Sequence, residues 1–422
     1  LENLKSQLNT LTSLTLDGTK LESSSSIPEL NFSNNSSLTT LSLTNFPNTT
    51  VTLPTNGGNI RSLTLNNVKT DSLDLSAMNN LETLSLLNLS GTDLTLPSSN
   101  TGITTLTLDN LEFDSIDLSG MTGLTTINLR NMSKGFHVDF GSNTTTTTLD
   151  LTGSDLSEYE NDQIKGDLDA LTTLTLNNTN ISSFDSSSIS GLSKLKKIHL
   201  NNNAALEKVV FNAGDNNLEY IYIESCANPT EISIEDNQKV IHISLSGTKI
   251  TTAGLHLAEE YEKLSGLDLQ NTGLDGTFKI PGFKSTNSTW SGTISQQVYM
   301  PNTDVEVIDV SNAGTLRMLV ASNCKNLRKI SGTEQISQLS ALEVRNVPNL
   351  HYLDLPNLKK DTSFGELDVS GTDLAYLNIP DSVDDLPYFN KFNSSNLKTQ
   401  SIDVEIGGYD ETRGYWADLE AA

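Results

Sequence analysis

The side chains best suited to binding chemistry lie within one stretch, residues 197–246. Three short segments in it, KIHL, YIYI and HISL, alternate apolar residues with basic, aromatic or imidazole side chains. Alternation with a period of two is typical of strands with one buried face, so the polar members would project from the other face. Aromatic and charged groups on adjacent strands are common components of protein-binding hot spots, and exposed tyrosines can also stack on sugar rings. The sequence therefore predicts a binding patch, with ordinary cross-strand packing of exposed tyrosines as the alternative; the patch comprises Lys197, His199, Tyr220, Tyr222, Glu224 and His242.

Residues capable of catalysis or metal binding do not form a known motif. No H-E-x-x-H, G-x-S-x-G, Walker A or zinc-spaced Cys/His set is present, and the acidic segments DQIKGDLDA and SIEDN lack EF-hand spacing. We therefore expect a non-enzymatic protein with no catalytic residues, no metal and no cofactor. One alternative stays open, because paired carboxylates on neighbouring coils could serve a polysaccharide lyase or hydrolase built on a β-solenoid.

A short recurring pattern positions these strands. ITTLTLDN (103–110), LTTLTLNN (171–178) and IRSLTLNN (60–67) share the spacing L-x-x-L-x-L-x-N. The L-x-L core predicts a short strand, and Asn fits the following turn because it tolerates left-handed backbone. The apolar pairs recur about every 22 residues, and a second, weaker strand follows about half a period later. One such strand cannot bury its apolar face alone, so stacked units are expected to form a solenoid.

The repeat resembles the leucine-rich repeat family. The segments VASNCKNLRKIS (320–331), VRNVPNLHYLDL (344–355) and LDVSGTDLAYLNI (367–379) are similar to the bacterial cell-surface type, whose repeats run strand, Asn turn, strand. The resemblance implies a non-enzymatic, protein-binding surface. Strands on both faces of each coil, with little helix between them, predict a mainly β solenoid that forms a flat or weakly curved rod.

Breaks in the repeat define the expected organisation. Residues 1–380 are predicted to form the solenoid, with residues 278–303 as a non-repeat insertion that contains Trp290, and residues 381–422 as an aromatic-rich capping segment. Residues 251–266 carry apolar side chains at helical spacing, which predicts a short helix. Cys226 and Cys324 lie about four coils apart, beyond disulfide reach, and are expected to be buried in repeat turns.

Composition limits the classes of partner. The formal net charge is −26, which disfavours nucleic acid and anionic membrane surfaces because both require clustered Lys and Arg. The sequence shows no transmembrane run and no signal peptide, so we expect no membrane insertion in this segment. We interpret the chain as a secreted or cell-surface, monomeric, adhesin-like scaffold. Its partner would be an extracellular protein or, as the alternative, a glycan.

Overall fold

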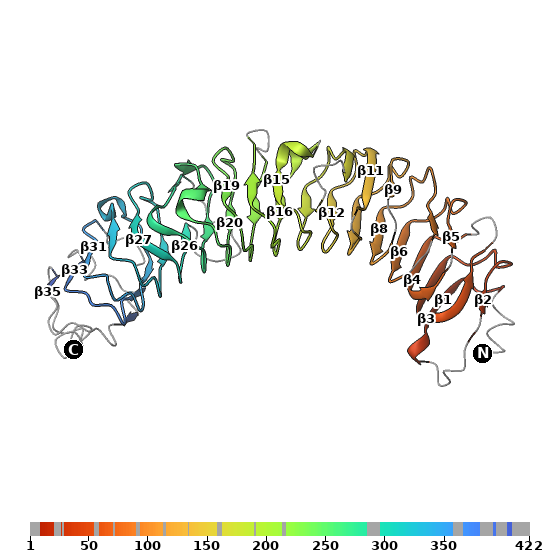
Figure 1. Cartoon of the computed structure of the whole chain (residues 1–422), viewed down its shortest axis with the longest axis horizontal. Helices are drawn as coiled ribbons and strands as arrows, with labels where there is room; N and C mark the ends of the chain where they lie inside the picture. Colours follow the sequence, from red (N-terminus) through yellow and green to blue (C-terminus); the bar gives the residue numbers. More distant parts are fainter. Residues whose placement is uncertain are drawn as a thin grey trace. The chain divides into compact units, whose positions relative to one another are not determined.

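Two units make up the chain. The first comprises Leu1–Ser182 and Ser186–Asn203, and the second comprises Ser183–Asp185 and Ala204–Ala422. The computed structural model describes residues 9–20, 27, 29–54, 59–70, 72–89, 93–112, 115–133, 135–157, 163–189, 191–212, 217–284, 296–357, 366–379, 391–393 and 403–406. Figure 1 shows that, within each unit, each coil of the chain lies beside the coil that follows it in the sequence.

The first unit contains a parallel sheet in which each strand pairs with the strand of the next coil. The register aligns Leu84 with Leu106 and Leu106 with Ile127, so equivalent repeat positions lie side by side. The strands of this sheet are β1 (Ser13–Asp17), β3 (Thr40–Thr52), β4 (Ser62–Lys69), β6 (Thr83–Leu87), β8 (Thr105–Asp109), β10 (Thr126–Arg130), β12 (Thr148–Asp150), β14 (Thr173–Thr175) and β16 (Lys197–His199).

Shorter strands form the second face of the first unit. They also pair in parallel, as in the alignment of Ile116 with Val138. They are β2 (Glu29–Asn31), β5 (Ser72–Asp74), β7 (Asp93–Thr95), β9 (Ser115–Asp117), β11 (His137–Ser142) and β13 (Ile164–Asp167), accompanied by the 3-10 turns η1 (Gly18–Lys20), η4 (Ser186–Ser188) and η5 (Leu192–Lys194).

The second unit repeats this architecture. Its first parallel sheet contains β18 (Tyr220–Tyr222), β20 (His242–Ser244), β23 (Gly266–Asp268), β26 (Gln297–Tyr299), β28 (Met318–Val320), β30 (Ala341–Glu343), β32 (Glu366–Asp368) and β34 (Lys391–Asn393). Its other strands are β15 (Ser183–Asp185), β17 (Lys208–Val210), β19 (Glu231–Ser233), β21 (Leu255–His256), β22 (Glu260–Tyr261), β24 (Asp275–Lys279), β25 (Gly282–Phe283), β27 (Asp304–Asp309), β29 (Lys329–Ser331), β31 (Tyr352–Asp354), β33 (Tyr376–Ile379) and β35 (Asp403–Ile406), with the 3-10 turns η6 (Thr252–Gly254) and η7 (Thr333–Gln335).

The prediction of a mainly β solenoid with little helix is confirmed. The described residues contain parallel strands and a few three-residue 3-10 turns, but no α-helix. The core is a row of apolar side chains that runs through the coils, and Leu84, Leu106 and Ile127 are each fully buried. Each coil therefore buries its narrow apolar face against its neighbours, as the repeat pattern requires.

The expected helix at residues 251–266 is wrong. This segment instead forms η6, β21 and β22 before the chain enters β23. Leu255 pairs with Ile232 of the preceding coil, and Tyr261 pairs with Phe283 of the following one. Backbone pairing of residues 255–256 and 260–261 with the adjacent coils supplies hydrogen-bond partners, and this outweighs the local helical spacing of the apolar residues.

The two predicted breaks in the repeat are only partly within the described residues. Gln297–Tyr299, inside the predicted insertion 278–303, forms β26 and pairs with β23 and β28. Trp290 lies outside the described residues, as do all of residues 381–422 except those of β34 and β35. The assignment of residues 381–422 as a cap stays a prediction.

The asparagine that follows the strand has the left-handed backbone that its turn requires. Asn88, Asn110 and Asn131 have φ angles of 53°, 55° and 53°. Their side chains also link coils, because the amide of Asn110 donates to the Asn88 side-chain oxygen at 2.9 Å. Asn is suited to both roles, since it tolerates left-handed backbone and carries a donor and an acceptor.

Replacing Asn110 with Ala is expected to lower the free energy of unfolding by about 1–2 kcal/mol, because Ala is strained at positive φ. Asn110→Gly is the matched control, since it also removes the side-chain hydrogen bond but adopts this backbone freely. Urea unfolding followed by circular dichroism measures the difference. Equal stabilities of the Ala and Gly variants would contradict the backbone explanation.

Candidate functional site

Strands β18 and β20 hold most of the predicted binding residues. Their register pairs Tyr220 with His242 and Tyr222 with Ser244, while Ile221 and Ile243 between them are fully buried. The buried isoleucines fix the strands to the core, so the flanking side chains must lie on the opposite face. Tyr220, Tyr222 and His242 are half-buried on this face, as the alternation predicted.

The rings of Tyr222 and His242 are in contact. Their centroids lie 5.6 Å apart and their planes are tilted by 48°, which is within the range of favourable aromatic pairs. The partner of His242 on the next strand is Gly266, and a Cβ at that position would lie only 2.6 Å from the imidazole Nδ1. The absence of a side chain at Gly266 therefore leaves the space that the His242 ring occupies.

Polar groups surround this aromatic pair. The Ser244 hydroxyl donates to the Glu224 carboxylate at 2.6 Å. Burial lowers the pKa of His242, and the nearby carboxylates of Asp268 and Glu224 oppose that shift only in part. The imidazole is therefore mainly neutral near pH 7. Burial, and then the neighbouring Tyr220 and Glu224, raise the pKa of Tyr222, so the face presents neutral rings beside a carboxylate.

Lys197 and His199 belong to the first unit and lie on β16. They align with Thr173 and Thr175 of β14. Both are half-buried, and Ile198 between them is fully buried. The second unit thus brings together four of the predicted residues, Tyr220, Tyr222, Glu224 and His242. Lys197 and His199 form a pair within the first unit.

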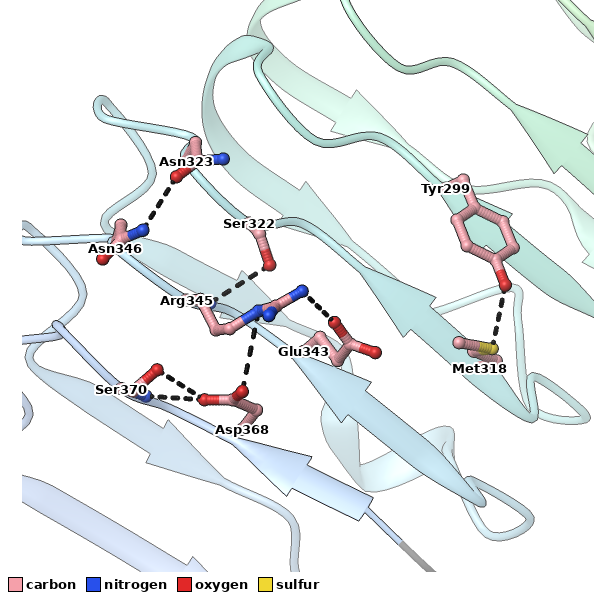
Figure 2. Close-up of polar contacts among 9 residues, drawn as sticks. All are labelled: Tyr299, Met318, Ser322, Asn323, Glu343, Arg345, Asn346, Asp368 and Ser370. Atoms are coloured by element: carbon pink, nitrogen blue, oxygen red, sulfur yellow. Dashed lines mark hydrogen bonds and ion pairs between the residues drawn. The ribbon is translucent and has the colours of Figure 1, made fainter. Parts of the chain in front are cut away.

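A second polar cluster in the second unit was missed by sequence reasoning. Figure 2 shows Arg345 between two carboxylates that come from adjacent strands. Its guanidinium lies 2.8 Å from Glu343 and 3.6 Å from Asp368. The Asp368 carboxylate also accepts from the Ser370 hydroxyl at 2.6 Å. The available signal was the repeat register, which aligns Glu343 with Asp368.

This cluster bears on the enzyme alternative, because it contains paired carboxylates on neighbouring coils. The side chains of Glu343 and Asp368 are 15% and 10% exposed, and one half-exposed guanidinium pairs with both. Carboxylates used as acid and base need environments that separate their roles. A shared ion pair instead fixes both side chains, so the arrangement is better suited to a rigid surface than to proton transfer.

Tyr299 lies on the same face of the second unit, as Figure 2 shows. Its hydroxyl donates to the Met318 sulfur at 3.4 Å. Burial, followed by the charges of Glu343 and Asp268, raises the pKa of Tyr299. Aromatic, thioether and carboxylate groups therefore lie on strands that continue the sheet of β18 and β20.

Other expected features can be placed as well. Cys226 and Cys324 are buried free thiols, as predicted for small residues in repeat turns. Among the residues that the structure describes, no group of three or more His, Cys, Asp or Glu side chains could hold a metal ion. In the same part of the chain, no helix is long and apolar enough to cross a membrane.

Comparison with known proteins identifies a family and several similar structures. The family described as Leucine rich repeat matches residues 144–204. No curated protein matches the sequence. The functional domain of InlJ from Listeria monocytogenes is 17% identical, with 92% of this chain and 73% of that domain covered and a TM-score of 0.38.

Two further solved structures are also similar. An internalin (inlF) from Listeria monocytogenes is 16% identical, with 78% of this chain and 88% of that one covered and a TM-score of 0.39. A leucine-rich-repeat protein from Leptospira interrogans is 17% identical, with 84% of this chain and 92% of that one covered and a TM-score of 0.43.

The residues matched by the family, 144–204, contain β12, β14 and β16. These strands pair in register with one another and, through β10, with β8. The matched coils are therefore equivalent to those that carry the L-x-x-L-x-L-x-N pattern at residues 103–110. Because this two-strand coil recurs through both units, the chain has the fold of a leucine-rich-repeat solenoid, and residues 144–204 match the family itself.

Proposed function

We propose that the chain is a non-enzymatic extracellular scaffold that recognises proteins, in the manner of an adhesin, through its exposed strand faces. The observation that carries this proposal is the contact of Tyr222 with His242, whose ring centroids are 5.6 Å apart on adjacent, backbone-paired strands. Such aromatic groups contribute a large share of binding energy at protein interfaces.

The scaffold favours binding because it fixes its side chains in advance. Tyr220, Tyr222 and His242 alternate with fully buried isoleucines, so the strand cannot rotate without disrupting the core. Binding of a partner therefore costs little conformational entropy, because these side chains are already ordered. Glu224, held by Ser244 at 2.6 Å, adds a carboxylate that can select partners with basic groups.

The proposed site in the second unit therefore consists of Tyr220, Tyr222, Glu224 and His242, and Lys197 and His199 on β16 form a separate candidate pair within the first unit. Its location on the chain's strand faces, together with the acidic and hydroxyl-rich composition, fits a secreted or cell-surface protein that meets its partner outside the cell. We propose that it acts as a monomer and needs no cofactor.

The double substitution Tyr220→Ala/Tyr222→Ala tests this function. A binding screen of the purified chain against extracellular proteins and a glycan array would first provide a partner. The variant is then expected to bind a protein partner about 30-fold or more weakly, since loss of hot-spot tyrosines costs about 2 kcal/mol or more. Surface plasmon resonance measures the affinity.

Thr105→Ala/Thr107→Ala is the matched control, because these threonines flank a buried leucine of β8 in the same alternating arrangement. It should bind as the unaltered chain does. If the tyrosine variant keeps full affinity while its circular dichroism is unchanged, the proposed surface is wrong. A hit on the glycan array that depends on the tyrosines would instead favour carbohydrate recognition.

A further inference from the structure

Strands β31 and β33 of the second unit carry a pair of stacked tyrosines, on a different sheet from β18 and β20. Tyr352 and Tyr376 occupy aligned positions, with ring centroids 4.5 Å apart and planes only 5° from parallel. Tyr352 is 54% exposed, and it is the one large hydrophobic side chain that is exposed in the described part of the chain. One face of its ring is covered by Tyr376, so a ligand that stacks on Tyr352 must use the opposite face.

A fixed carboxylate lies beside these rings. Asp354 accepts a hydrogen bond from the Tyr352 hydroxyl at 3.2 Å and another from the Asn378 amide at 2.9 Å. Each contact uses a different carboxylate oxygen, and an ionised carboxylate has about four acceptor positions. Asp354 is thus held in place by its neighbours while it can still accept from a further donor.

The two strands that carry the tyrosines, YLD and YLNI, contain Asp354 and no Lys or Arg. The face of an aromatic ring carries the negative part of its quadrupole, so the exposed ring of Tyr352 and the Asp354 carboxylate attract the same kind of ligand.

We propose that the pair of strands β31 and β33 binds a basic segment of a partner protein, with an arginine side chain stacked on the face of Tyr352 that Tyr376 does not cover. A planar guanidinium can lie flat on the ring and donate N–H groups to Asp354 at the same time. A lysine ammonium lacks the planar face, and a neutral sugar gains no charge attraction from Asp354. This surface is independent of the Tyr220/Tyr222 site, so either can fail without the other.

The test measures binding of an arginine-rich peptide to the full chain, by fluorescence anisotropy at physiological salt. Two variants leave the net charge unchanged: Tyr352→Phe keeps the aromatic face, and Tyr352→Leu removes it but keeps an apolar side chain. Tyr352→Phe loses only the hydroxyl that donates to Asp354, so we expect Tyr352→Leu to bind the peptide roughly two- to fivefold more weakly than Tyr352→Phe does. Because charge is constant, general attraction to an acidic protein cannot produce this difference.

A second comparison isolates the carboxylate. Asp354→Asn should weaken the binding of the arginine-rich peptide. Asp117→Asn makes an equal change of charge on β9 of the first unit and should leave this binding unchanged. A lysine-rich peptide should respond less to Tyr352→Leu than the arginine-rich one. The proposal is overturned if Tyr352→Leu binds the arginine-rich peptide with unaltered affinity. It is equally overturned if that variant loses only the binding of a neutral oligosaccharide, which would make the surface a sugar platform.

Discussion

Replacing Leu106 with Asp is expected to unfold the coils around β8 and to lower the free energy of unfolding by at least about 5 kcal/mol. Leu106 is fully buried, and its aligned neighbours in the sheet are Leu84 and Ile127. The substitution removes apolar packing and places an unpaired carboxylate in a core that is only one coil wide. Thermal melting followed by circular dichroism measures the loss.

Thr107→Asp is the matched control for this prediction. It introduces the same charge at the next residue, whose side chain lies on the exposed face of the same strand. We expect its melting temperature to change little, because a solvated surface charge has a small effect on stability. Hydrogen exchange should show loss of protection centred on β6, β8 and β10 in Leu106→Asp. Similar melting of the two variants would contradict the assigned repeat register.

Replacing Tyr261 with Ala is expected to be the most damaging single change in the segment 251–266, with a cost of about 3–5 kcal/mol. The Tyr261 side chain is fully buried. Its hydroxyl donates to the Ile234 carbonyl at 3.2 Å and accepts from the Ala258 N–H at 3.2 Å. Burial also raises the pKa of Tyr261 above its usual range, so the phenol stays protonated and can keep donating.

Tyr261→Phe separates the contribution of the packed ring to stability from that of the hydroxyl. It keeps the packed ring but leaves the Ile234 carbonyl and the Ala258 N–H without this partner, so we expect a smaller cost of about 1–2 kcal/mol. Urea unfolding of both variants measures the two contributions. If Phe destabilises as much as Ala, the hydrogen bonds and not the packed ring hold this segment, and the assignment of Tyr261 as a core anchor fails.

The solenoid itself could be predicted because its determinants are local and repeated. Every coil carries its own L-x-L strand and, in many coils, an Asn such as Asn110 that adopts positive φ. Errors in one repeat do not affect the pattern in the next. The same locality predicted that Tyr220, Tyr222 and His242 lie on the face opposite the core, and in the structure they are half-buried on adjacent strands that pair Tyr220 with His242.

The segment 251–266 could not be predicted in this way. Its apolar residues have helical spacing, but Leu255 and Tyr261 pair with strands of the preceding and following coils. Local periodicity reports only which side chains are buried together, and it does not include hydrogen bonds offered by residues about one coil away in sequence. Those backbone partners decided that the segment is extended.

The sequence by itself determined the repeat, the alternation of buried and exposed residues, the turn asparagines and the acidic charge. All of these depend on residues a few positions apart, where short-range sterics and apolar patterning are sufficient. Only the tertiary structure decided which side chains meet across coils: Tyr222 with His242 above Gly266, Arg345 with Glu343 and Asp368, and Tyr352 with Tyr376. Those contacts depend on the exact lateral register and on side-chain volume at each position, and neither quantity is contained in a single repeat.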